Sequence, residues 1–304
     1  MRKVGMAVAL LAAGVVVPAV ASQTAAADGP GVGAPWVVSV GDSYISGEGG
    51  RWAGNSNSSS SSVDAGGSAA YYDNATHTAE TINRCHRSTA AEIHIGGGIN
   101  SANLACSGAK TSTFMDSSGN FKPGIDFYLS GSNKGQARML QEFAATHNVK
   151  MIQLSIGGNN FNFADIIQSC VSDFLLSPSW WPDYCNDDSS VTANFTSANI
   201  TAQTNAILGA INNIKTAMAN AGYSAGSYTI VQQTYPSPVP GGAGFRYSQS
   251  GYTRQSTGGC GFWNRDADWA NSSALPTINN TVKGALTASG IAGAKVLELQ
   301  SAFN

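Results

Sequence analysis

Short runs of apolar, β-branched residues alternate along the chain with longer segments of helical periodicity. The apolar runs predict strands over 36–40, 104–106, 151–156, 228–232 and 295–299. The periodic segments predict helices over 135–147, 164–176, 197–220 and 275–289. Strands that alternate with helices are typical of a parallel sheet with helices on both faces. The sequence therefore predicts one α/β domain built in three layers.

The amino terminus has the pattern of an export signal. Arg2 and Lys3 precede an apolar run that ends in Ala19-Val20-Ala21, and small residues at this spacing are typical of a cleavage site. We expect a secretory signal peptide over residues 1–21, or up to residue 27 if cleavage follows Ala25-Ala26-Ala27. The mature domain then covers 28–304, and we expect a secreted protein.

The composition excludes two classes of partner. Charged residues make up only 11% of the chain, and removal of the leader leaves 14 basic against 18 acidic residues. Such a balance lacks the basic surface of a nucleic-acid-binding protein, so no nucleic-acid partner is expected. Beyond the leader, no segment is apolar enough to predict a stable membrane span.

Five cysteines allow fifteen schemes in which two disulfides form and one thiol is left over. No two of them are spaced as C-x-x-C and no H-E-x-x-H motif occurs, so no metal site is predicted. In an oxidising compartment we expect disulfides. Proximity in sequence favours Cys85–Cys106 and Cys170–Cys185, which leaves Cys260 unpaired.

Turns of small residues follow three of the predicted strands. Gly41-Asp42-Ser43 follows the first strand, Ser107-Gly108 the second, and Gly157-Gly158-Asn159 the third. Because ligands bind beyond the carboxyl ends of parallel strands, all three turns should meet at one edge of the sheet. Ser43 is then a candidate nucleophile for acyl transfer, and Gly108 and the Asn159 amide are candidate donors to an oxyanion.

A second serine motif is a weaker candidate. Gly222-Tyr223-Ser224-Ala225-Gly226 has the G-x-S-x-G spacing of a nucleophile elbow, which requires a strand before the serine and a helix after it. Here a predicted helix precedes Ser224 and a predicted strand follows it. We therefore interpret this stretch as the turn that ends a helix.

With these three blocks in this order, residues 36–304 resemble the GDSL or SGNH hydrolases. The resemblance implies a flavodoxin-like three-layer fold and a serine esterase or lipase that needs no cofactor, with Ser43 as nucleophile and Gly108 and Asn159 at the oxyanion. Tyr44 and Asn160 depart from the family's pattern, which has leucine and aspartate there. The cysteines and Gly47-Glu48 also resemble secreted actinobacterial members, in which three disulfides are usual.

The general base that this family uses is not found in the chain. Its histidine follows the last strand, whereas this sequence stops at Asn304. His147 precedes its strand and should lie at the opposite edge, and His77 and His94 lie in no motif. His86, beside Cys85, is the least unlikely substitute, but the resemblance implies a structural role for it in the family's Cys-x-Arg-Ser segment. The resemblance thus favours a sequence that lacks its C-terminal end, where both the histidine and a partner for the fifth cysteine would lie.

The alternative function is a non-catalytic extracellular binding protein on the same fold. It would use the Trp180-Trp181 loop and the region of Tyr247 and Tyr252 as aromatic contacts, although packing around the Cys170–Cys185 disulfide is the favoured interpretation of these rings. The expected ligand of the enzyme is a small-molecule or lipid ester, or an ester of a glycan or polymer. The sequence does not distinguish these substrates.

Overall fold

A five-stranded sheet forms the centre of the protein. In the computed structural model, which describes residues 31–52 and 66–302, the strand order is β2-β1-β7-β8-β9. The strands are β1 (Pro35–Gly41), β2 (Asn100–Asn103), β7 (Asn148–Ser155), β8 (Thr229–Gln233) and β9 (Lys295–Leu297). Every neighbouring pair is parallel. Counted along the chain this order is 2-1-3-4-5, which is the flavodoxin-like order. The predicted fold class is confirmed.

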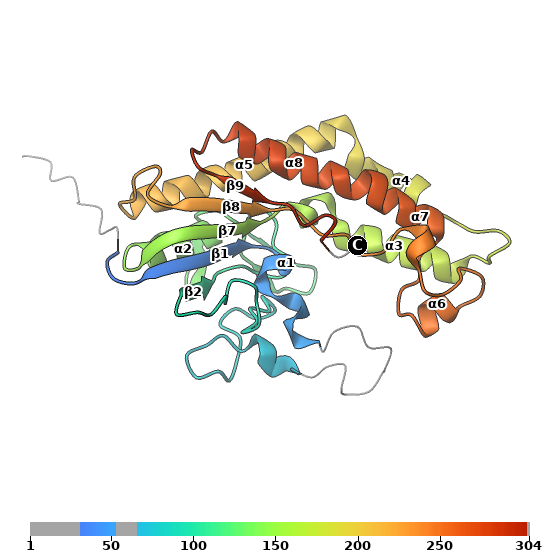
Figure 1. Ribbon diagram of the computed structural model, residues 1–304, viewed down its shortest axis with the longest axis horizontal. Helices are drawn as coiled ribbons and strands as arrows, with labels where there is room; N and C mark the ends of the chain where they lie inside the picture. Colours follow the sequence, from blue (N-terminus) through green and yellow to red (C-terminus); the bar gives the residue numbers. More distant parts are fainter. Residues whose placement is uncertain (1–30, 53–65, 303–304) are drawn as a thin grey trace, which may run out of the picture.

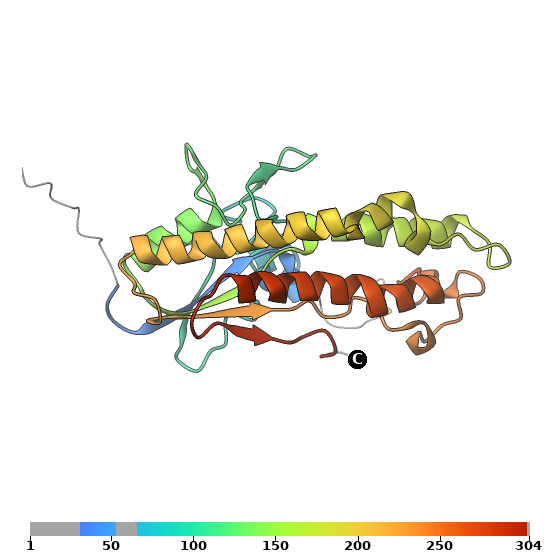
Figure 2. The same ribbon diagram turned by 90° about the horizontal axis from the view of Figure 1, so that it is seen from above.

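Three long helices form a layer on one face of this sheet. These are α2 (Gln136–Ala144), α5 (Ser197–Asn220) and α8 (Leu275–Ala288), and Figure 2 shows α5 and α8 lying side by side. Helix α5 contacts both α2 and α8. Alternate strand residues, among them Val38, Ile152 and Ile230, are fully buried beneath the layer with the helical side chains Ile211 and Val282. This burial is the main hydrophobic contribution to stability.

The other face of the sheet has a different cover. Val37 and Met151, paired across β1 and β7, point to this face and pack with Ala91 and Ile93. Those two residues belong to an irregular segment between the two cysteines of the Cys85–Cys106 disulfide. On this face the described cover is therefore mostly loop, with the short α1 (Ser43–Ser46) at the carboxyl end of β1.

Other helices and turns extend the molecule beyond the carboxyl ends of the strands (Figure 1). They include α3 (Phe163–Leu176), α4 (Ser189–Thr192), α6 (Thr253–Ser256), α7 (Asn264–Trp269) and the π-helical turn Ala270–Ala274. A second hydrophobic cluster lies here and contains the Cys170–Cys185 disulfide together with Ile166 and Phe262. Two hairpins, β3 (Phe114–Met115) with β4 (Phe121–Lys122) and β5 (Leu129–Ser130) with β6 (Asn133–Lys134), complete the described strands.

One predicted strand lies elsewhere in the structure. Residues 104–106 are not a strand; β2 is the polar segment that precedes them. The prediction followed the apolar residues, but β2 lies at the edge of the sheet and all its side chains are half-buried, so it needs no apolar run. Leu104 and Cys106 still donate hydrogen bonds to Ser39 and Gly41 of β1.

Two further predictions concern the membrane and the leader. Residues 1–21 and 22–27, predicted as the signal peptide and its later cleavage site, lie outside the described residues. Among the residues that the structure describes, no helix has both the length and the apolar character needed to cross a bilayer.

Candidate active site

The first turn places Ser43 at the carboxyl end of β1. Gly41 has φ +140°, and a Cβ there would lie 1.9 Å from the carbonyl oxygen of Ser155, so only glycine fits. Asp42 donates its N–H to the same oxygen at 2.8 Å and caps α1 by accepting from the Tyr44 N–H. Ser43 is thus the first residue of α1 and remains partly exposed.

The second turn lies against the first. Cys106 donates its N–H to Gly41 O at 3.0 Å, and Gly108 then adopts φ +77°. The Lys122 ammonium group holds this turn by donating to Ser107 O at 2.9 Å and to Arg84 O at 2.7 Å. Gly108 therefore lies beside the β1 turn, although the strand predicted over 104–106 before it does not form.

Side-chain amides connect the third turn to the second. Gly157 has φ +125°, and the 3₁₀ helix Gly158–Phe161 begins directly after it. The Asn159 Nδ2 donates to Ala109 O at 2.9 Å. Asn160 accepts from the Thr111 N–H at 3.1 Å and donates to the Thr111 hydroxyl at 2.9 Å. The asparagine that departs from the family's pattern at position 160 thus fixes the distance between these two turns.

Tyr235 connects the first turn to the third. Its hydroxyl accepts from the Gly158 N–H at 2.9 Å and donates to Asp42 Oδ2. Both side chains are buried. Burial raises the pKa of Asp42 to about 7, against the lowering effect of its hydrogen bonds from Tyr235, Tyr44 and Ser155. Burial also raises the pKa of Tyr235, and the adjacent carboxyl group of Asp42 adds to this. The hydrogen bonds of one tyrosine therefore determine how two of the three turns lie relative to each other.

Gln136 is a second positioning residue that the sequence did not indicate. Its fully buried side chain accepts from the Gly41 N–H at 2.7 Å and donates to Gly41 O at 2.9 Å. Gln136 is 95 residues away in sequence, at the start of α2. A glutamine in the first turn of a helix is usually exposed, so the sequence around Gln136 does not indicate that its side chain holds Gly41. Tyr235 could have been predicted as a positioning residue, because it follows β8 and therefore lies at the same edge of the sheet as Ser43.

Several donors at this edge are free. Within the described residues, the backbone N–H groups of Ser43 and Gly108 donate no hydrogen bond, and the Asn159 amide uses one of its two hydrogens. The Ser43 hydroxyl likewise has no described partner. The edge therefore combines a free hydroxyl with N–H groups on three separate turns.

None of the four histidines hydrogen-bonds to Ser43 within the part of the chain that the structure describes. They bond to Tyr72 O (His77), Glu48 (His86), Ser101 (His94) and Phe143 O (His147). His147 packs against Trp36 beside the start of β7, which is the amino edge of the sheet. His86 stacks on Tyr71 and lies 2.8 Å from Glu48. Each of the four histidines therefore bonds to a residue other than Ser43.

Further predictions concern Ser224, the cysteines and metal binding. Ser224 is exposed in the turn between α5 and β8, at the amino ends of the strands. Disulfides join Cys85 with Cys106 and Cys170 with Cys185, and Cys260 is unpaired. Among the residues that the structure describes, no three or more His, Cys, Asp and Glu side chains form a group that could hold a metal ion.

Comparison with known proteins gives only distant similarities. No protein-family model matches the chain, and no curated protein is similar to it in sequence. The crystal structure of the extracellular lipase from Streptomyces rimosus is similar with 18% identity and a TM-score of 0.40, over 88% of this chain and 81% of the lipase. Phospholipase A1 from Streptomyces albidoflavus NA297 is similar with 17% identity and a TM-score of 0.40, over 87% of this chain and 79% of the phospholipase. At this distance neither structure assigns a role to a residue of this chain.

Proposed function

We propose that the protein is a secreted serine esterase or lipase of the GDSL or SGNH type, which hydrolyses carboxylic esters through an acyl-enzyme on Ser43. The observation that carries this proposal is the hydrogen-bonded edge at which the turns of Ser43, Gly108 and Asn159 meet. Esterases need a free hydroxyl and donors for the developing oxyanion on a rigid frame. The bonds through Tyr235 and from Asn159 to Ala109 supply such a frame.

In the proposed reaction the Ser43 hydroxyl oxygen attacks the carbonyl carbon of the ester. The negative charge on the carbonyl oxygen is stabilised by the N–H groups of Ser43 and Gly108 and by the second hydrogen of the Asn159 amide. The general base accepts the Ser43 proton and gives it to the leaving oxygen, so the ester C–O bond breaks and the alcohol leaves. Water, deprotonated by the same base, then attacks the acyl carbon, and the proton returns to the Ser43 oxygen as the acid is released. The Cys85–Cys106 and Cys170–Cys185 disulfides support export, because disulfides persist in oxidising compartments.

The mechanism needs a general base, which in the family that the chain resembles is a histidine after the last strand. Residues 298–304, which follow β9, contain no histidine. Residues of that segment lie along the edge of the sheet that holds Ser43: Ser237 donates its N–H to Gln300 O at 3.3 Å, and Asn279 donates to the Gln300 side chain at 3.1 Å. Asn279 also binds both the N–H and the carbonyl of Tyr235. The segment after β9 therefore lies beside Tyr235, whose hydroxyl bonds to Asp42, the neighbour of Ser43.

A fluorophosphonate probe, which labels activated serines, tests the nucleophile. We expect labelling and hydrolysis of p-nitrophenyl esters, both lost in Ser43→Ala and both kept in Ser224→Ala, which removes a serine of the competing motif at the opposite edge. Asn159→Ala should lower kcat by about 10²–10³ because one oxyanion donor is lost. Labelling that survives Ser43→Ala, or that disappears in Ser224→Ala, would refute the proposal.

A further inference from the structure

Several large apolar side chains are exposed to solvent at the carboxyl end of α3. Leu176 is 85% exposed, Trp180 82% and Trp181 74%, and the exposed Tyr252 of the neighbouring α6 region lies beside them. We call these four residues the aromatic tip. It lies at the end of the molecule beyond the carboxyl edge of the sheet (Figure 1). A soluble protein rarely exposes such a group of large apolar side chains without a partner.

The loop that carries Trp180 and Trp181 is held in place by its own bonds. Ser177 ends α3, donates its hydroxyl to Asp173 O and accepts from the Asp183 N–H at 2.9 Å. The disulfide between Cys170 and Cys185 closes the loop at its base. The exposed rings are therefore presented on a constrained loop, which lowers the entropy that a partner must remove on binding.

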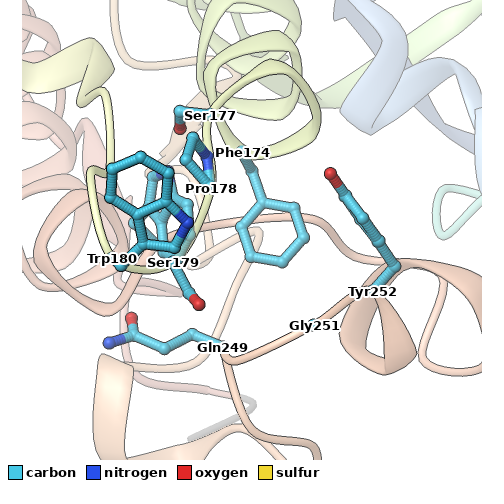
Figure 3. A pocket seen from close by; sticks show the side chains of 9 residues that line it. Phe174, Ser177, Pro178, Ser179, Trp180, Gln249, Gly251 and Tyr252 are labelled. Carbon is cyan, nitrogen blue, oxygen red and sulfur yellow. The ribbon is translucent and has the colours of Figure 1, made fainter.

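A cavity of about 240 Å³ opens between the rings of the tip. Figure 3 shows Trp180 and Tyr252 on opposite sides of the Phe174 ring, with the Gln249 side chain below. Beneath them Phe174 packs on Trp263 with ring centroids 4.7 Å apart. The cavity is smaller than the pockets of about 300–1,000 Å³ that hold drug-sized ligands, so it admits a small head group rather than a whole lipid or oligosaccharide.

The side chains of the tip favour a lipid surface over a polysaccharide. Tryptophan and tyrosine rings concentrate at membrane–water interfaces, because one end of the ring is apolar and the other forms hydrogen bonds. A sugar would stack on these rings but would gain little from Leu176, which is the most exposed of the four. An exposed leucine beside two tryptophans is what insertion into the acyl boundary of a bilayer requires.

The charges around the tip select the type of lipid. No lysine or arginine occurs between Lys150 and Lys215, whereas Asp173, Asp183, Asp187 and Asp188 lie on or beside the loop of Trp180 and Trp181. On the segment of Tyr252, Arg254 is buried and donates to Tyr247 O and Phe262 O, and Arg246 lies over the Tyr247 ring. Arg265 pairs with Asp187 at 2.8 Å. Anionic head groups would be repelled, whereas a choline trimethylammonium group is attracted both by aromatic faces and by carboxylates.

We propose that the aromatic tip docks the protein on a lipid–water interface of zwitterionic, choline-bearing lipids. Helix α3 has 14 residues and spans about 21 Å, so the tip lies well away from the turn of Asn159. Docking is therefore a separate function from ester hydrolysis. It can be measured in the Ser43→Ala protein, where lipids stay intact, and does not depend on the esterase proposal.

Sedimentation with phosphatidylcholine vesicles tests the docking surface. In the Ser43→Ala background, Trp181→Ala and Leu176→Ser should each weaken vesicle binding at least about tenfold, since each removes a large side chain from the lipid. The matched controls are Trp52→Ala and Leu129→Ser, which are 52% and 53% exposed elsewhere on the surface and should leave binding unchanged. Thermal unfolding checks that every variant is folded.

Three results would overturn the proposal. The first is equal binding by tip and control variants, and the second is tighter binding to vesicles of anionic phosphatidylglycerol than to phosphatidylcholine. The third is tip-dependent binding to an insoluble polysaccharide without binding to vesicles, which would assign the rings to a glycan. A measurement without tip substitutions completes the test: brominated phosphatidylcholine should quench the tryptophan fluorescence, and unchanged fluorescence would contradict docking.

Discussion

Replacing Tyr235 by phenylalanine should destabilise the protein, and more strongly at alkaline than at acidic pH. The substitution removes one hydroxyl that accepts from the buried Gly158 N–H at 2.9 Å and donates to the buried Asp42 carboxyl group. At about pH 5 Asp42 is mostly protonated, because its pKa is raised to about 7. The loss is then that of neutral hydrogen bonds to buried groups, about 1–3 kcal/mol.

The pH dependence follows from the direction of the pKa shift. A group whose pKa is raised on folding binds more protons in the folded state, so Asp42 lowers stability as the pH rises from about 4 to 7. The hydrogen bond from Tyr235 opposes this shift, and its removal raises the pKa of Asp42 further. Above pH 7 the variant must also bury a carboxylate that has lost a charge-assisted bond, which adds about 1–2 kcal/mol.

Urea denaturation at pH 5 and pH 8 measures both parts of this prediction. We expect the free energy of unfolding of Tyr235→Phe to fall below that of the parent by about 2 kcal/mol at pH 5 and about 3–4 kcal/mol at pH 8. Tyr228→Phe is the control, since Tyr228 is half-buried and bonds to no carboxyl group among the described residues. A loss that is equal at both pH values, or larger in acid, would refute the role given to Asp42 and Tyr235.

Three further predictions concern the backbone and the cysteines. Gly41→Ala should lower the free energy of unfolding in urea by more than about 3 kcal/mol, because it adds a clash to a strained φ. Gly226→Ala, at φ +87° with open space around the residue, should lower it clearly less. Replacing Cys170 and Cys185 together by alanine opens a loop of 15 residues and should lower stability by about 3 kcal/mol in thermal unfolding, and an unchanged Tm would contradict this. Burial raises the pKa of the Cys260 thiol, so iodoacetamide should alkylate it slowly in the native protein and rapidly in urea; equal rates would show an accessible thiol.

Local patterns were sufficient for most of the fold. The apolar spacing over 197–220 predicted a helix, and α5 spans Ser197–Asn220. The run before Gly41 predicted β1, because β-branched residues buried on both faces leave few other structures possible. The strand over 104–106 was wrong, since the edge strand β2 is selected by backbone hydrogen bonds to β1 and its sequence has no apolar pattern.

The sequence by itself predicted that the turns of Ser43 and Asn159 meet. They directly follow β1 and β7, and parallel strands bring their carboxyl ends to one edge whatever lies between them. The turn of Gly108 was predicted to follow a strand over 104–106 that does not form, and the hydrogen bond from Cys106 to Gly41 brings it to the same edge. Only the tertiary structure decided how these turns are held, because Tyr235 is 193 residues from Asp42, and no local pattern records a contact across that separation. The raised pKa of Asp42 has the same origin, since it depends on burial beneath side chains from other elements.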